Sequence, residues 1–300
     1  MSNVCDMRID REHMQNPFPR IQVDLITTTN PTKMNIIIPI IPATVRNIMD
    51  FTLLVVGISL NAFLGLFIVL NSTMHTSTNC YIVGLVLSNF VILLEPLEQV
   101  LNWIFDIHLK MNLDYVFLMS FVTSNLTIIL LNIETYVIIC QKNSPLLKPL
   151  LKISTAVKGI LFIWAMCIMA TAIELHLYDH FVKEIIYDIY VSSTIMFIIF
   201  PCFIFILLNY FILYDLILLK SKTETLSKDM KRFISLVGIY TGFFVTMVPY
   251  RIARAITLIT QSHYNNMAIE ITYTMVKMYP IILPIICFVI WKESRQISRG

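Results

Sequence analysis

Charged residues are scarce in this chain, and that scarcity excludes most soluble folds. Asp, Glu, Lys and Arg make up only 14% of the 300 residues, whereas about a quarter of the residues of a soluble domain are charged. The net charge of +3 is small and gives no reason to expect nucleic acid as a partner. Glycine is also rare, with 7 residues, and the glycine-rich loop that cradles a phosphate is missing.

Cysteine patterns that would hold a metal are missing from the sequence as well, and His176 and His180, which share one helix face and could bind a metal in principle, are better explained as part of a solvated loop entrance. Of the 6 cysteines, no two have the C-x-x-C spacing of a metal site, and their positions give no disulfide framework. We find no His/Glu metal set and no nucleophile elbow. The sequence therefore predicts neither a metal site nor an enzyme.

Apolar residues fill the chain almost from end to end. An α-helix needs ~20 apolar residues to cross a bilayer, and backbone groups in hydrocarbon must pair within the helix itself. The sequence predicts an all-α membrane protein, a seven-transmembrane helix bundle, with an N-terminal segment at 1–47, the bundle at 48–291 and a short tail at 292–300. The expected spans are 48–71, 79–104, 111–140, 153–176, 187–219, 230–260 and 266–291.

Basic residues in the loops predict the orientation of the bundle. Lys and Arg accumulate in cytoplasmic loops, and here they follow the third and fifth spans. We therefore expect the N-terminus outside and the C-terminus in the cytoplasm. The N-terminal segment lacks the pattern of a cleaved signal peptide, so the first span is expected to serve as the targeting signal. The basic clusters are Lys142, Lys148, Lys152 and Lys158, then Lys220, Lys222, Lys228, Lys231 and Arg232.

Ionisable residues inside the spans are costly in lipid and usually face the bundle interior. Arg251 and Arg254 share one helix face, and their guanidinium groups suit a carboxylate or phosphate. One interpretation is a pocket for an anionic group. The other is internal pairing, for example Lys277 with Glu95, while Arg254 and Glu98 extend to the membrane surface.

Prolines lie within several of the expected spans. Each removes a backbone hydrogen bond and permits a kink, so these helices can act as hinges or can simply be bent. The prolines in question are Pro96, Pro201, Pro249, Pro280 and Pro284.

Each expected span contains a residue or short motif that resembles a landmark of the rhodopsin-like G-protein-coupled receptors. The resemblance covers about residues 48–295. Asn61, Asn89, Trp164 and Pro201 stand where that family has span landmarks. The third span ends in Glu134-Thr135-Tyr136, similar to the family's Asp/Glu-Arg-Tyr. Further matches are Phe243 with Thr246-Met247-Val248-Pro249 for Cys-Trp-x-Pro, and Leu283-Pro284-Ile285-Ile286-Cys287 for Asn-Pro-x-x-Tyr.

Several polar switch residues of the family are replaced. Thr135 stands in place of the arginine that contacts the G protein and closes a latch to the sixth span, so Asp229, near the latch position, has no arginine partner. Asn89 replaces the aspartate that helps to bind sodium, and Met247 replaces the toggle tryptophan. The scaffold resembles the family, whereas much of its activation machinery is changed.

The resemblance implies a plasma-membrane receptor that binds an extracellular ligand. Its pocket would be lined by Phe117, Arg251, Arg254, Tyr273 and Lys277. Because Phe117 occupies the place of the amine receptors' aspartate, a peptide or small anionic ligand is expected instead of an amine. The implied inner partner is a heterotrimeric G protein. The implied coupling and switch residues are Asn61, Asn89, Glu134, Thr135, Tyr136, Pro201, Phe243, Met247, Pro249 and Pro284.

Three alternatives stay open at this point. Thr135 and the changed seventh span favour a non-signalling decoy, chaperone or heteromer partner. Lys277 precedes Pro284 by seven residues, as the retinal-binding lysine of opsins precedes its proline, so retinal is a possible cofactor on Lys277. A transporter or channel is disfavoured because the charges lie toward one end of the spans and no inverted repeat is visible.

Overall fold

A bundle of long helices makes up the protein in our computed structural model, which describes residues 42–108, 113–145, 147–180, 183–218, 223–260 and 267–297. Within these ranges the chain contains no strand, and seven helical segments are long and apolar enough to cross a membrane. The prediction of an all-α seven-helix membrane bundle is confirmed. The predicted orientation of the termini stays a prediction.

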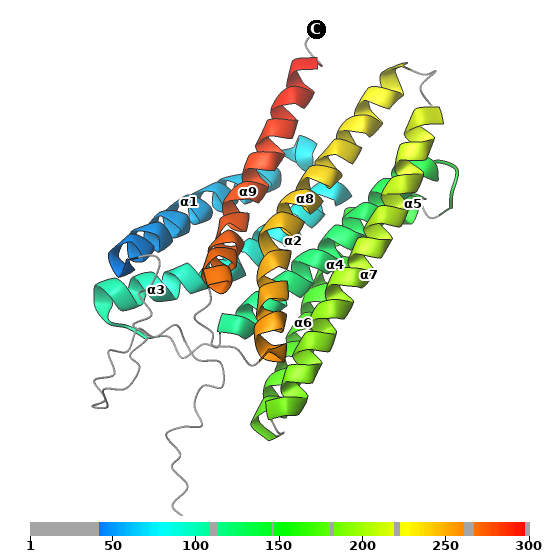
Figure 1. Ribbon diagram of the computed structural model, residues 1–300. Helices are drawn as coiled ribbons and strands as arrows, with labels where there is room; N and C mark the ends of the chain where they lie inside the picture. Colours follow the sequence, from blue (N-terminus) through cyan, green and yellow to red (C-terminus); the bar gives the residue numbers. More distant parts are fainter. Residues whose placement is uncertain are drawn as a thin grey trace, which may run out of the picture.

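The helices agree with the expected spans to within a few residues at most ends, and the last one continues past 291 to Ile297. Figure 1 shows them with these labels. The long helices are α1 (Ala43–Leu70), α2 (Ser77–Ile92), α3 (Leu94–Phe105), α4 (Leu113–Cys140), α6 (Ile153–His180), α7 (Lys183–Leu218), α8 (Thr223–Ile259) and α9 (Met267–Ile297), and the short ones are η2 (Ser72–Met74) and α5 (Leu147–Leu150).

The second span is broken, although the sequence predicts one continuous stretch at 79–104. Helix α2 ends at Ile92, and α3 begins at Leu94. Pro96 has no N–H to donate to the Ile92 carbonyl, so the chain turns between the two helices. The break turns the first residues of α3 into the bundle, where Glu95 is fully buried.

Helix α4 lies at the centre of the bundle. It contacts α2, α6, α7 and α8, whereas α9 lies between α8 and α1 (Figure 1). In α4, 67% of the most apolar window is buried, compared with 11% for α7. We call the end where α1 begins and α8 ends the predicted outer end, and the end where α4 stops at Cys140 the predicted inner end.

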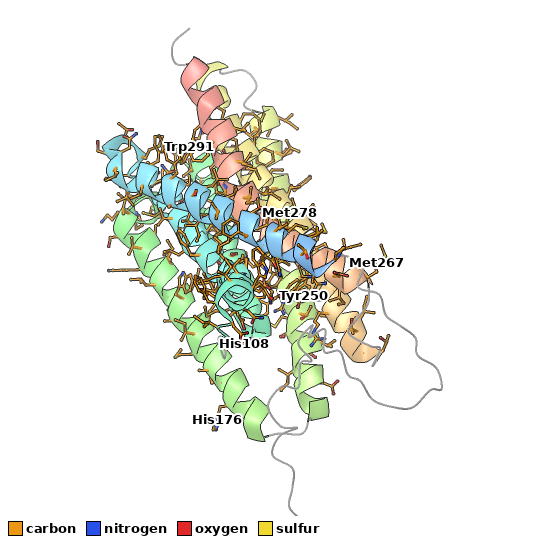
Figure 2. The ribbon with its side chains drawn as sticks, turned by 90° about the vertical axis from the view of Figure 1, so that its left-hand side faces the viewer. His108, His176, Tyr250, Met267, Met278 and Trp291 are labelled. Carbon is orange, nitrogen blue, oxygen red and sulfur yellow. The ribbon has the colours of Figure 1, made fainter. Side chains whose placement is uncertain are left out.

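Large apolar side chains point away from the bundle, as expected for a protein surrounded by lipid. Figure 2 shows these side chains projecting from the helices, with Met278 (44% exposed) on the outside and Tyr250 (1% exposed) inside. On α7, Phe203 and Ile206 are 63% and 68% exposed. The outward surface thus supplies the apolar contact that lipid requires.

Two asparagines donate hydrogen bonds to backbone carbonyls that lose their helical donor because of a proline. A proline has no N–H, so the carbonyl four residues earlier loses its helical donor. Asn125 Nδ2 on α4 donates to the Phe197 carbonyl at 2.6 Å, four residues before Pro201 on α7. Asn61 Nδ2 on α1 donates at 2.6 Å to the Pro280 carbonyl on α9, four residues before Pro284. Each of these proline-containing stretches is therefore bonded to another helix.

The second of these bonds belongs to a larger polar core. Asn89 Nδ2 on α2 donates to Asn61 Oδ1 at 2.8 Å, so α1, α2 and α9 meet at one point. Nearby, Ser88 Oγ lies 2.7 Å from Ser124 Oγ and connects α2 to α4. All four side chains are fully buried. Such interhelical hydrogen bonds hold membrane helices together.

Replacing Asn125 with Leu is expected to lower the free energy of unfolding by about 1–3 kcal/mol, the cost of a buried polar group left unpaired. Thermal unfolding of the purified protein in detergent measures the change. The double variant Asn125→Leu/Pro201→Ala restores a backbone donor for Phe197 and should recover part of the loss.

Asn209→Leu is the matched control for this experiment. Asn209 Nδ2 also donates to a carbonyl on α7, that of Phe205, at 2.6 Å. The Phe205 carbonyl, however, also has the backbone N–H of Asn209 in helical position as a donor. We therefore expect a smaller loss for Asn209→Leu, and equal losses for the two variants would contradict the pairing described here.

Candidate functional site

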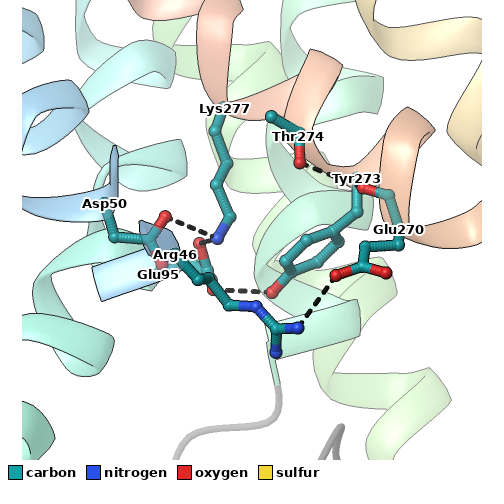
Figure 3. Close-up of polar contacts among 7 residues, drawn as sticks. All are labelled: Arg46, Asp50, Glu95, Glu270, Tyr273, Thr274 and Lys277. Carbon is teal, nitrogen blue, oxygen red and sulfur yellow. Dashed lines mark hydrogen bonds and ion pairs between the residues drawn. The ribbon is translucent and has the colours of Figure 1, made fainter. Parts of the chain in front are cut away.

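A cluster of buried charges joins three helices in the half of the bundle near the predicted outer end. Lys277 Nζ on α9 lies 2.8 Å from Asp50 Oδ1 on α1 and 3.0 Å from Glu95 Oε2 on α3. Tyr273 donates its hydroxyl to Glu95 Oε1 at 2.7 Å (Figure 3). Asp50, Glu95 and Lys277 are 2%, 0% and 4% exposed. We call these four residues the ion cluster.

The ion cluster confirms one part of the sequence analysis and adds a residue that it missed. The predicted pairing of Lys277 with Glu95 is confirmed. Asp50 was overlooked because it lies close to the expected start of the first span at 48, where a charge can reach water. The spacing of Arg46 and Asp50, four residues apart on one helix face, is the signal that could have identified it.

A second ion pair lies one turn closer to the predicted outer end. Arg46 Nη2 on α1 is 2.8 Å from Glu270 Oε1 on α9, with the two side chains 25% and 20% exposed (Figure 3). It connects the same two helices as the Asp50–Lys277 pair. Because it is partly exposed, it contributes little stability by itself. The deeper pair carries the stronger constraint, since separating buried charges is costly.

Arg251 and Arg254 are both 2% exposed. The interpretation that Arg254 and Glu98 reach the membrane surface is therefore wrong, because Glu98 is also only 7% exposed. Helix α8 continues beyond Arg254 to Ile259, and α3 continues beyond Glu98 to Phe105, so neither residue lies at a helix end. The Arg251 guanidinium carbon lies 5.1 Å from the centre of the Phe121 ring on α4, a cation–π contact.

Aromatic rings connect the ion cluster to α4 and α8. The Phe117 ring centre lies 5.4 Å from that of Tyr273 and 5.9 Å from that of Tyr250. Lys277 Nζ lies 4.5 Å from the Tyr273 ring centre. The structure thus brings Phe117, Tyr273 and Lys277 together, with Tyr250 as a residue that the sequence analysis missed. Arg251 follows Tyr250 directly and belongs to the adjoining group around Phe121.

The predicted switch residues Met247 and Phe243 lie about one and two turns deeper along α8 than Arg251. Phe243 is 1% exposed and stacks on Phe121, with ring centres 5.5 Å apart. Phe243 also meets Tyr279 on α9, with ring centres 5.6 Å apart. Met247 is 2% exposed in the same core. Phe121 therefore contacts both Arg251, near the predicted outer end, and Phe243, deeper in the bundle.

At the predicted inner end, the Glu134-Thr135-Tyr136 segment is held by local bonds. Glu134 accepts hydrogen bonds from Ser77 Oγ and, at 3.2 Å, from Thr78 Oγ1, both on α2. Thr135 Oγ1 donates to the Leu131 carbonyl of its own helix at 2.8 Å. The positive charge of Arg232 on α8 also attracts Glu134, so α8 presents a cation to this segment.

A different ion pair joins α4 to α8 at this end. Lys142 Nζ, two residues after α4 ends, lies 2.9 Å from Asp229 Oδ2 on α8. Asp229 therefore has a partner, and that partner is a lysine outside the expected motif. The Lys142 side chain is 47% exposed, so water weakens the attraction and the pair can open at small cost.

Comparison with known proteins adds no assignment. No protein-family model matches the chain, and no curated protein sequence matches it either. The resemblance to rhodopsin-like receptors therefore rests on the sequence landmarks alone.

Lys277→Met is expected to lower the free energy of unfolding by about 3–5 kcal/mol, because it leaves Asp50 and Glu95 buried without a cation. Thermal unfolding in detergent gives the change. Lys158→Met, at an exposed position on α6, removes a lysine without removing a buried pair and serves as the control. Adding Asp50→Asn and Glu95→Gln to Lys277→Met should recover stability. Equal unfolding midpoints for the two lysine variants would rule out the structural role.

Proposed function

We propose that this chain is a seven-helix receptor of the rhodopsin-like kind, located in the plasma membrane and activated by an extracellular ligand. The observation that supports it is the contact of Phe121 with both Arg251 and Phe243. A ligand that draws Arg251 away changes the surroundings of Phe121 and, through it, of Phe243. Such a ligand acts by binding one arrangement of the helices more tightly than another.

The charges favour an anionic ligand. Arg251 and Arg254 are two buried cations on one face of α8, and arginine binds carboxylate or phosphate through two parallel hydrogen bonds. Phe117 supplies an aromatic wall and no carboxylate for an amine. An acidic peptide or a small anion therefore fits this part of the protein better than a biogenic amine.

Helix α8 would carry the signal to the predicted inner end. Pro249 lies one turn beyond Thr246, in the stretch between Phe243 and Arg251, and weakens the helix there. The Lys142–Asp229 pair is the exposed contact that α8 would break as it moves. A cleft opened between α4 and α8 would receive the G protein, with Glu134, Thr135 and Tyr136 on its α4 side.

A non-signalling seven-helix partner protein is the second candidate, and Thr135 favours it. Its hydroxyl donates to Leu131 within α4, and no arginine stands beside it to contact a G protein. Glu134 is likewise occupied by Ser77 and Thr78. The bundle would then bind ligand or another membrane protein without transmitting a signal.

Retinal on Lys277 is less well supported than either candidate. A Schiff base forms from a neutral lysine amine, and the Lys277 amine is held between Asp50 and Glu95. Two carboxylates at this distance favour the charged ammonium. The same contacts give Lys277 a structural role in holding α1, α3 and α9 together.

Arg251→Gln is expected to weaken the binding of anionic probes by about 10- to 100-fold, the range for a lost hydrogen bond to a charged group. Cells that display the protein would be exposed to fluorescent acidic peptides and to small carboxylates and phosphates. Arg46→Gln is the control, because Arg46 pairs with Glu270 nearer the surface. Unchanged affinity of Arg251→Gln at normal surface expression would contradict the anion site.

Thr135→Arg is expected to raise basal or ligand-stimulated G-protein signalling, because it adds the cation that Asp229 and a G protein can contact. Second-messenger and arrestin assays in cells measure the response. Thr135→Gln adds comparable bulk without charge and should not signal. Silence of the wild type and of Thr135→Arg in every assay, with both at the cell surface, would exclude the receptor and favour the non-signalling partner.

A further inference from the structure

A groove with a volume of about 600 Å³ lies between α8 and α9. Its floor includes Val248 and Ile269, which are 3% and 1% exposed, and its rim includes Val245 and Ile256, which are 51% and 53% exposed. None of the five predicted ligand-binding residues lines it. The groove is therefore a separate site from the ion cluster and from the arginines.

Differences in side-chain size along the two helices explain where the groove opens. Near the predicted inner end, α9 packs directly on glycine: a Cβ on Gly242 would lie 3.0 Å from Ile286 Cδ1 and 3.2 Å from Ile282 Cγ2. Toward the predicted outer end, the facing residues Ala253 and Ala268 are small and leave space that nothing on either helix fills. Pro249 lines the groove between these two regions.

The surroundings of the groove exclude water as its normal content. Both helices belong to the membrane-crossing segments Asp229–Thr257 and Met267–Trp291, so the rim faces hydrocarbon. A buried water needs two to four polar partners. Among the lining side chains that the structure describes, Thr257 supplies the single hydroxyl and none is charged. A lipid molecule from the bilayer is the occupant that suits this lining.

We propose that the groove binds one sterol, with its fused rings on Val248 and Ile269 and its hydroxyl at Thr257. Thr257 Oγ1 donates to the Ala253 carbonyl at 2.7 Å, which leaves its lone pairs to accept a hydrogen bond from a hydroxyl. Thr257 is the last residue of the apolar segment of α8. That is the depth at which the hydroxyl of a sterol meets the aqueous boundary.

The shape and stiffness of the lining favour a sterol over a phospholipid chain. From Phe244 to Thr257 the groove follows 13 residues of α8, or about 20 Å, against ~30 Å for the hydrocarbon core. Its floor and rim are mostly branched side chains with few rotamers, so the surface is preformed. A rigid ring system loses little entropy on such a surface, whereas a flexible acyl chain loses more. No cation lines the groove to hold a phosphate.

Photolabelling tests the proposal. The full chain, reconstituted in phosphatidylcholine vesicles with a diazirine-bearing cholesterol, should be labelled within the peptides that cover 244–257 and 267–275. Ala253→Phe fills the groove from a half-exposed position and should reduce this labelling at least ~10-fold. Ala165→Phe, on the exposed face of α6, is the matched control and should label like the wild type. Unchanged labelling of Ala253→Phe overturns the site.

The chemistry of the ligand is tested by Thr257→Val, which keeps the shape and removes the hydroxyl. It should weaken sterol labelling by about 2- to 10-fold, the range for one neutral hydrogen bond. Labelling by a 3-keto analogue, which has no hydroxyl to donate, should be unaffected by this substitution. If diazirine-acyl phosphatidylcholine labels the same peptides and excess cholesterol does not compete with it, the occupant is an acyl chain and the sterol proposal fails.

Discussion

Every proline inside a membrane-crossing helix leaves a carbonyl that lipid cannot pair, and this constraint organises the bundle. Asn125 meets it for α7 by bonding to the Phe197 carbonyl, and Asn61 meets it for α9 by bonding to the Pro280 carbonyl. Both bonds cross from one helix to another, so each one pairs the open carbonyl and also connects two helices. Asn89 then adds α2 to the second of these contacts.

The two ends of the bundle are constrained to different degrees. Near the predicted outer end, buried ions and edge-to-face aromatic rings join α1, α3, α4, α8 and α9. At the predicted inner end, the ion pair that joins the end of α4 to α8 is the exposed contact of Lys142 with Asp229. Movement of α8 is thus cheaper at the inner end. This asymmetry suits the receptor proposed above, because a small rearrangement around Arg251 would become a larger displacement at the inner end.

Sequence reasoning predicted the seven spans well because hydrophobic length is a property of each segment alone. It also predicted the Lys277–Glu95 pair, because two opposite charges in lipid have few other solutions. It missed the contacts of Asp50, Asn125 and Lys142, because their partners lie on distant helices and depend on packing. One of its two interpretations extended Arg254 and Glu98 to the membrane surface, because helix ends cannot be located to within a turn. The groove between α8 and α9 has no signature in the sequence at all.

The ion cluster also bears on how the chain enters the membrane. Ribosomal synthesis proceeds from the N-terminus, so α1 and α3 arrive with Asp50 and Glu95 long before α9 brings Lys277. Until then, two carboxylates lack their cation. Placing helices with unpaired acidic side chains in lipid costs free energy. The last helix therefore completes the charge balance of the first ones. A chain truncated before α9 would leave those acids exposed to cellular quality control, so biogenesis can distinguish finished bundles from unfinished ones.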